Sequence, residues 1–259
     1  MAQRLQVIKQ PAENWLDWWG HRGGSAEAVM AVWRSAQRHV LEPTPELLAR
    51  SQAQAKASWW AWPPRRGQAS RVLAPEALPE ARFQMLWSNL VLNTAARPAN
   101  LMAAWHRCLA PQGLLMFSSF GPDTLRGLRA VYAELGWPEP HAPFVDMHDL
   151  GDLLVHGGFA DPVMDQEPLT LNWSSPQAAL AELRELGVNL SPRRHSGLRT
   201  PRWHQALCEA LARRCSVQGR ISLDFELVYG HAYKGVPRRA PDEPAVVSLS
   251  SLRSKLSKI

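Results

Sequence analysis

Two acidic residues and a glycine-containing turn are the residues in this chain best placed to do chemistry. Asp17 lies in the apolar segment 15–18, and Gly20 and Gly23 follow it in a turn. After a helical pattern, a second apolar segment ends at Glu42. A strand, a glycine turn, a helix and a second strand that ends in an acid are the layout of a βαβ unit that holds a nucleoside-bearing cofactor. The pattern predicts such a unit over residues 15–42.

The same turn carries bulky residues where a close approach of backbone to ligand favours small ones. Trp18 and Trp19 precede Gly20, and His21 and Arg22 follow it. Each tryptophan covers on the order of 150–250 Å², so the two rings could fill the space of a cofactor. Alternatively, the rings face the core and the loop still admits a ligand. The sequence leaves both alternatives open.

The rest of the chain must supply the sheet that positions this unit. Apolar and alternating runs predict strands at 15–18, 40–41, 59–62, 83–92, 114–117, 162–173 and 221–229. Helical periodicity and capping residues predict helices at 26–38, 44–57, 98–109, 123–134, 146–156, 176–186 and 201–214. Residues 63–70 and 111–113 are expected to be a loop and a turn. Strands that alternate with helices predict an α/β fold with a doubly wound, mostly parallel sheet.

Composition narrows the class of protein further. Hydrophobic residues make up 46% of the 259 residues, and no apolar run is long enough to cross a bilayer. We therefore expect a cytoplasmic protein, with residues 1–234 as one domain and 235–259 as a flexible basic tail. The three cysteines are expected to be free thiols. The net charge of +6 suits an acidic partner such as an acyl carrier protein, non-specific nucleic acid, or only solvent.

Several longer segments carry a resemblance to a known family. They are Phe83–Leu90, Leu109–Leu125, Phe144–Leu154, Gly158–Asp165 and Val228–Tyr233. Together they resemble class I S-adenosylmethionine-dependent methyltransferases, and among these the malonyl-acyl-carrier-protein O-methyltransferase family of biotin synthesis. The resemblance covers residues 15–234 and is strongest from 83 onward. It implies a Rossmann-like, seven-stranded sheet whose last strand is antiparallel, with S-adenosylmethionine over the carboxyl ends of the first strands.

The resemblance also implies roles for individual residues. It implies that Asp17, Gly20, Gly23, Glu42 and Asn89 bind the cofactor, and that the carboxylate of Glu42 accepts the ribose hydroxyls. The family has three alternating glycines after its first strand. In an ungapped comparison Trp19 and His21 occupy the first two of these positions and Gly23 the third, whereas a shift by one residue recovers Gly20.

The implied reaction needs little from the protein as an acid or base. The carboxylate of a malonyl group is already a nucleophile, so we expect no catalytic side chain and no metal, only alignment of the reacting atoms. An arginine is the best donor to orient a carboxylate. Arg126 and Arg129, which follow the turn 120–122, are the candidates for binding substrate. The alternative is that both are exposed charges on a helix.

Two functions therefore compete, and a third is less favoured. The first is an active methyltransferase that acts on a malonyl-acyl-carrier-protein carboxylate. The second is a catalytically inactive protein of methyltransferase fold that serves as an interaction or regulatory partner. The third is non-specific nucleic-acid binding through the positive charge.

Overall fold

A single mixed sheet organises the chain. The structure is a computed structural model, which describes residues 1–8, 12–24, 26–59, 69–187 and 189–235. The strands lie in the order β3-β2-β1-β4-β5-β8-β6, and the short β7 pairs with β8 outside this path. β8 runs antiparallel to both β5 and β6, whereas the other neighbouring pairs of the path are parallel. The carboxyl ends of the parallel strands therefore meet at one edge of the sheet.

The strands differ greatly in length. Their bounds are β1 Asn14–Trp18, β2 Gln37–Leu41, β3 Ala69–Leu73, β4 Phe83–Ser88, β5 Leu109–Phe120, β6 Phe159–Trp173, β7 Ser216–Val217 and β8 Arg220–Lys234. The helices are α1 Ala26–Val32, α2 Pro45–Trp59, α3 Pro98–Cys108, α4 Arg126–Glu134, α5 Met147–His156, α6 Pro176–Glu185 and α7 Pro201–Arg214. Three short 3-10 helices are η1 Ala2–Val7, η2 Pro75–Ala77 and η3 Leu92–Thr94.

Helices cover both faces of the central strands. On one face, Trp105 of α3 and Leu154 of α5 pack against Leu16, Leu86 and other buried strand residues. On the opposite face, η1 and α1 cover a second cluster that contains Trp15 and Met85. Both faces of β1 and β4 are thus apolar, as is typical of strands buried inside a parallel sheet.

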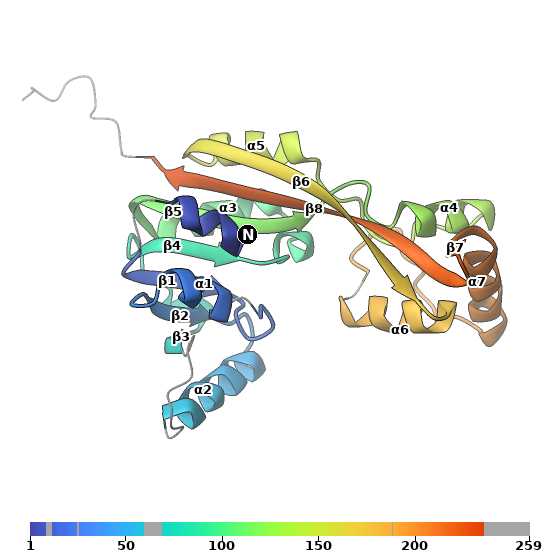
Figure 1. Ribbon diagram of the computed structural model, residues 1–259, viewed down its shortest axis with the longest axis horizontal. Coiled ribbons are helices and arrows are strands. Elements are labelled where there is room, and N and C mark those ends of the chain that lie inside the picture. The colour runs from blue at the N-terminus through green and yellow to red at the C-terminus, as the bar shows by residue number, and fades with distance from the viewer. Residues whose placement is uncertain (9–11, 25, 60–68, 188, 236–259) are drawn as a thin grey trace, which may run out of the picture.

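A lobe extends beyond the carboxyl edge of this sheet. β6 and β8 continue past the other strands and carry α4, α6, α7 and β7 (Figure 1). The lobe has its own core, in which Leu211 of α7, Val131 of α4 and Phe225 of β8 are buried together. The long hairpin of β6 and β8 therefore joins two separately packed regions.

The structure confirms the doubly wound sheet and its antiparallel last strand, with β7 as a small addition. The helices expected at 44–57, 98–109, 146–156, 176–186 and 201–214 all form, to within two residues at each end. Thr44 Oγ1 caps α2 by accepting from Leu47 N at 3.3 Å, and Pro45 begins that helix. The part of the tail from residue 236 lies outside the described residues.

Several local predictions are wrong. The strand expected at 83–92 ends at Ser88, and the expected loop 63–70 overlaps the start of β3. Helix α1 ends at Val32, because residues 37–41 pair in parallel with β1, where they bring Arg38 to the buried Asp17. Helix α4 begins at Arg126 because Leu125 has a left-handed φ of 55°. The turn expected at 111–113 lies within β5 as an irregularity in its pairing with β4. Trp59 ends α2 instead of starting a strand, and residues 60–62 lie outside the described part of the chain.

Candidate functional site

A buried ion pair lies beneath the turn that follows β1. Asp17 is 1% exposed, and Arg38 of β2 donates to its Oδ2 from Nε at 2.9 Å and from Nη2 at 2.6 Å. The same Nη2 also donates to the Gly20 carbonyl at 3.3 Å. Burial raises the pKa of Asp17, and Arg38 opposes that rise. The carboxylate of Asp17 therefore ties the turn to β2.

Glycine is required in this turn because the polar side chains approach its backbone closely. A Cβ on Gly20 would lie 2.7 Å from Asp17 Oδ2 and 2.8 Å from Arg38 Nη2, closer than real Cβ atoms come to other heavy atoms. A Cβ on Gly23 would make only ordinary contacts, the shortest at 3.6 Å to the Gly20 carbonyl oxygen. The Asp17–Arg38 ion pair thus requires a glycine at position 20. At position 23, the neighbouring protein atoms leave room for a side chain.

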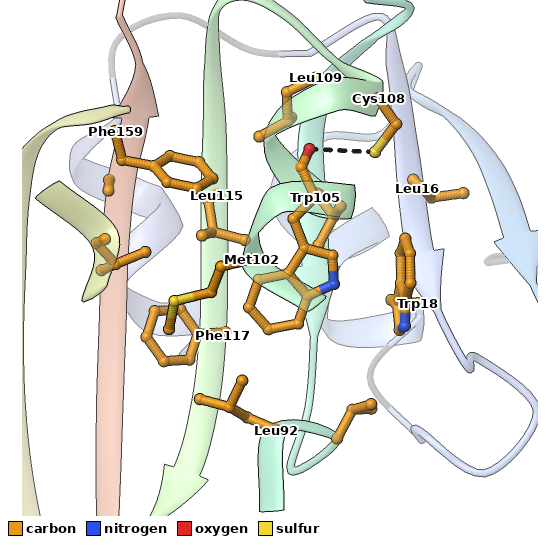
Figure 2. Packing of buried hydrophobic residues seen from close by; sticks show 14 of the residues in the cluster. Leu16, Trp18, Leu92, Met102, Trp105, Cys108, Leu109, Leu115, Phe117 and Phe159 are labelled. Carbon is orange, nitrogen blue, oxygen red and sulfur yellow. Dashed lines mark hydrogen bonds between the residues drawn. The ribbon is translucent and has the colours of Figure 1, made fainter. Parts of the chain in front are cut away.

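The two tryptophans of the turn face the helix layer. Trp18 points from β1 toward α3, where its ring meets Trp105 edge-on with centroids 6.2 Å apart (Figure 2). Trp19 packs against the same cluster. The rings therefore pack against the core, as the second alternative expects, and admission of a ligand by the loop stays a prediction. Trp19 has a left-handed φ of 60°, a conformation that is unfavourable for a bulky residue.

Glu42 lies immediately after β2, and within the described part of the chain only one of its two carboxylate oxygens has hydrogen-bond partners. Its Oε1 accepts from His21 N at 2.8 Å and from Ser51 Oγ of α2 at 2.8 Å. Its Oε2 is buried and has no hydrogen-bond partner among the described residues. Burial raises the pKa of Glu42, against the effect of the Ser51 and His21 hydrogen bonds. Oε2 is thus a buried acceptor that lacks a donor.

Asn89 connects the end of β4 to the turn. Its Oδ1 accepts from Ser118 Oγ of β5 at 2.6 Å, and its Nδ2 lies 3.5 Å from the Gly23 carbonyl oxygen. Ser118 Oγ in turn accepts from Leu90 N at 3.0 Å. This network holds the Gly23 end of the turn beside the carboxyl ends of β4 and β5.

An open cavity of about 390 Å³ adjoins this network. That volume is within the range of small-molecule sites, roughly 300–1,000 Å³. The cavity brings together two of the predicted cofactor residues, Gly23 and Asn89. Its full lining is Met1, Ala2, Gly23, Gly24, Ala28, Trp87, Asn89 and Tyr229. Asp17 and Glu42 are not part of the lining, since both are buried behind the turn.

The wall opposite the turn is built around Tyr229 of β8. Its hydroxyl donates to Glu167 of β6, and burial together with Glu167 raises the pKa of Tyr229 to about 12. The guanidinium of Arg4 lies 4.9 Å from the centre of the Tyr229 ring and also pairs with Asp165. These contacts hold η1 across β8 and β6, so that Met1 and Ala2 border the cavity.

The two arginines predicted to bind substrate lie on α4 and do not line the cavity. The side chain of Arg126 is 67% exposed and lies 3.6 Å from Asp123. Arg129 Nη2 donates to the Pro122 carbonyl at 2.6 Å. In the described residues the cofactor candidates thus form one continuous group, and Arg126 and Arg129 form another.

Sequence reasoning missed several residues of the site. Arg38 was assigned to a helix, although a lone arginine opposite a strand acid is a usable signal for an ion pair. Tyr229, Ser51 and Arg4 lie in no motif that the sequence reveals. Arg4 and Tyr229 contact strands far away in the sequence, and Ser51 reaches Glu42 through the fold of α2 after β2, so only the folded chain reveals these contacts.

Comparison with known proteins agrees with this architecture. A family profile described as a methyltransferase domain matches residues 20–117. Malonyl-(acyl-carrier protein) O-methyltransferase from Halorhodospira halophila is 34% identical over 247 residues, which cover 93% of this chain and 82% of the relative. The enzyme of the same name from Gallionella capsiferriformans is 35% identical over 257 residues, with 96% and 87% covered.

Solved structures share the fold at low sequence identity. The YcgJ protein from Bacillus subtilis has a TM-score of 0.59 at 10% identity, over 91% of this chain and 98% of that one. A phosphoethanolamine N-methyltransferase from Haemonchus contortus, solved with S-adenosylhomocysteine, has a TM-score of 0.53 at 11% identity, over 91% of this chain and 52% of that one. In the described residues, no helix is long and apolar enough to span a membrane.

Proposed function

This chain belongs to the malonyl-(acyl-carrier protein) O-methyltransferase family and is a methyltransferase. We propose that it methylates the free carboxylate of a malonyl thioester on an acyl carrier protein. The methyl donor in this proposal is S-adenosylmethionine. The product is the methyl ester. The sequence resemblance assigns this methylation step to biotin synthesis. The alternative of an inactive interaction partner is not favoured by the family relationship.

The observation that carries this proposal is the unpartnered Oε2 of Glu42. A buried carboxylate oxygen without a donor costs free energy, on the order of 1–3 kcal/mol, and a ribose hydroxyl would remove that cost. His21 and Ser51 hold Oε1, which fixes the direction of Oε2. The free Oε2 therefore suits a ribose hydroxyl, which would reach it once the turn in front of Glu42 moves aside, because Glu42 is 1% exposed and does not line the cavity.

The remaining cofactor residues suit the other half of the molecule. Gly23 and Gly24 expose backbone to the cavity without a side chain, and Asn89 holds that backbone in place. Asp17 acts from behind the turn, since Arg38 takes up its Oδ2. In this proposal Asp17 and Gly20 shape the turn, whereas Gly23, Glu42 and Asn89 contact the cofactor.

When bound, S-adenosylmethionine supplies an electrophilic methyl group on a sulfonium. The chain has to bring the malonyl carboxylate oxygen in line with that methyl group and exclude water, because alignment alone provides a large effective molarity. The cavity, which Tyr229 and Ala2 help to line, is open to solvent and would admit the substrate. Arg126 and Arg129 remain the predicted carboxylate donors, and Arg4 is a further candidate beside Tyr229.

The direct test is transfer of a methyl group to malonyl-acyl-carrier protein, followed by mass spectrometry of the intact carrier. The proposal predicts a mass gain of one methylene that depends on S-adenosylmethionine and is lost in Glu42→Gln. The exposed acid Glu46, whose side chain is 73% exposed, provides the matched control as Glu46→Gln. No methylation by the wild-type protein, at any ratio of enzyme to carrier, would contradict the proposal.

A further inference from the structure

The segment between α6 and α7 concentrates positive charge without compensation. Residues 189–202 contain four arginines and no aspartate or glutamate. Arg193 pairs with Glu139 at 3.0 Å. In the described part of the chain, Arg194, Arg199 and Arg202 have no carboxylate within ion-pair distance. Arg194 and Arg202 are exposed, so their charge is presented to solvent.

An exposed leucine lies among these arginines. Leu198 is 98% exposed, and Leu190, in the same segment, is 44% exposed. Leucines this exposed next to uncompensated cations are typical of a surface that contacts another protein, because interfaces combine apolar contact with complementary charge. We call Leu190, Arg194, Leu198, Arg199 and Arg202 the arginine–leucine loop.

The arginine–leucine loop is held to the rest of the lobe by specific contacts. Ser191 is 1% exposed, and Asn189 Nδ2 donates to the Pro140 carbonyl at 2.6 Å. The guanidinium of Arg199 lies 4.5 Å from the centre of the Trp203 ring, which also packs on Trp137 with centroids 5.0 Å apart. The loop is therefore positioned by folded structure at both of its ends.

The loop lies at the same edge of the sheet as the cavity. It contacts residues 139–140, and from the same α4–α5 connection Phe144 packs on Phe120, the last residue of β5, at 5.5 Å. Ser118 of β5 bonds to Asn89, which lines the cavity. Figure 1 shows the lobe beyond the carboxyl ends of β4 and β5. A partner held on the loop would thus lie at the edge of the sheet that carries the cavity.

We propose that the arginine–leucine loop is the docking surface for an acidic acyl carrier protein, with the arginines facing its carboxylates and Leu198 inserted among its apolar side chains. The identity of the partner rests on the function proposed above. Nucleic acid fits this surface less well, because the ring of Trp203 is already covered by Arg199 and an exposed leucine gives no hydrogen bonds to phosphate.

The test compares two loop variants with a control at the opposite edge of the sheet. Arg194→Glu combined with Arg202→Glu removes the charge, and Leu198→Asp removes the apolar contact. Arg82→Glu is the control, because Arg82 is exposed and precedes β4 at its amino end. Binding of malonyl-acyl-carrier protein is measured by calorimetry, and methyl transfer is measured with that protein and with malonyl-pantetheine, which lacks the carrier.

The proposal predicts that both loop variants weaken carrier-protein binding by about tenfold or more. Both variants should still methylate malonyl-pantetheine at the wild-type rate. Arg82→Glu should change neither measurement. Carrier-protein binding that is unchanged in both loop variants would overturn it. The same variants are titrated with duplex DNA, and a loss of DNA binding without a loss of carrier-protein binding would also overturn it. If the wild-type protein methylates neither substrate, the proposed function fails, and the binding measurement still decides whether the loop docks the carrier protein.

Discussion

At the carboxyl ends of β1 and β2 the charged groups are buried, whereas in the α6–α7 lobe, beyond the same edge, they are exposed. Asp17 and Glu42 are each 1% exposed, and Arg38 forms an ion pair with the buried Asp17. Arg194 and Arg202 face solvent without a carboxylate partner among the described residues. Buried charges depend on close geometry and little on salt, whereas exposed charges act at a distance and are screened. In our proposals, the buried end serves as the cofactor site and the exposed lobe as an electrostatic docking surface.

The largest expected effect tests whether the tryptophans at the buried end are core residues. Trp18→Ala removes a ring that is 7% exposed and packs on Trp105. We expect the free energy of unfolding to fall by about 3–5 kcal/mol in urea titration, as for other buried aromatics. Leu198→Ala in the lobe is the control and should change nothing. Equal stability of Trp18→Ala and wild type would mean that the ring does not belong to the core.

The next effect concerns the ion pair beneath the turn. Arg38→Met leaves the Asp17 carboxylate buried without its cation, and we expect a loss of about 3 kcal/mol of unfolding free energy. Arg126→Met removes an exposed partner of Asp123 and should cost at most about 1 kcal/mol. Chemical denaturation at low and high salt checks both values. A strong salt dependence of the Arg38→Met effect would argue against a buried pair.

The Glu42→Gln variant tests whether the buried Glu42 contributes to cofactor binding and not only to the stability of the fold. The amide keeps an oxygen for His21 N and Ser51 Oγ but loses the charge, so we expect affinity for S-adenosylhomocysteine to fall about tenfold. Calorimetric titration measures that affinity, with Glu46→Gln as the control. An unchanged affinity would remove Glu42 from the site.

The pH dependence of stability gives a second readout for Glu42. Burial raises its pKa above 4.5, so the folded state holds the proton more tightly than the unfolded state. Its contribution to stability is therefore complete below 4.5 and is lost as pH rises through the folded-state pKa. Unfolding measured from about pH 4 to pH 7 should show Glu42→Gln gaining on wild type as pH rises. Wild type gaining stability relative to Glu42→Gln as pH rises would contradict a raised pKa of Glu42.

The smallest effect addresses backbone strain at Trp19. Trp19→Gly and Trp19→Ala both remove the ring, but only glycine adopts a φ of 60° without a steric penalty. We expect the glycine variant to be more stable than the alanine variant by about 1 kcal/mol in thermal or urea unfolding. If alanine is equally stable, the turn has relaxed and the strain is not a property of the native loop.

Regular periodicity made much of the fold predictable. Strands form in the apolar runs that begin at Phe83 and Leu114, with different ends from those expected. The helices expected at 44–57, 146–156 and 201–214 form nearly as expected, because local signals and tertiary packing agree there. The helix over 26–38 was extended too far because Arg38 looks like a helical surface residue until its partner is known. Arg38 lies in β2, where it forms an ion pair with Asp17 of the neighbouring strand β1.

The candidate site was predictable only in part. Gly23 and Asn89 meet at the cavity as the family resemblance implies, and Glu42 lies at the end of β2. Ser51, Tyr229 and Arg4 carry no local motif, since each reaches the site through the packing of α2, β8 or η1 against distant strands. The arrangement of the two tryptophans likewise needed the position of α3, which the sequence of the turn does not contain.

The most direct test of the central claim, that the altered turn still forms a cofactor site, is calorimetric titration of the full-length protein with S-adenosylmethionine and S-adenosylhomocysteine. We predict one-to-one binding in the micromolar range for both ligands, weakened by Glu42→Gln and unaffected by Arg194→Glu with Arg202→Glu. No heat and no shift of the melting temperature at millimolar ligand would contradict the account and direct attention to a role without the cofactor.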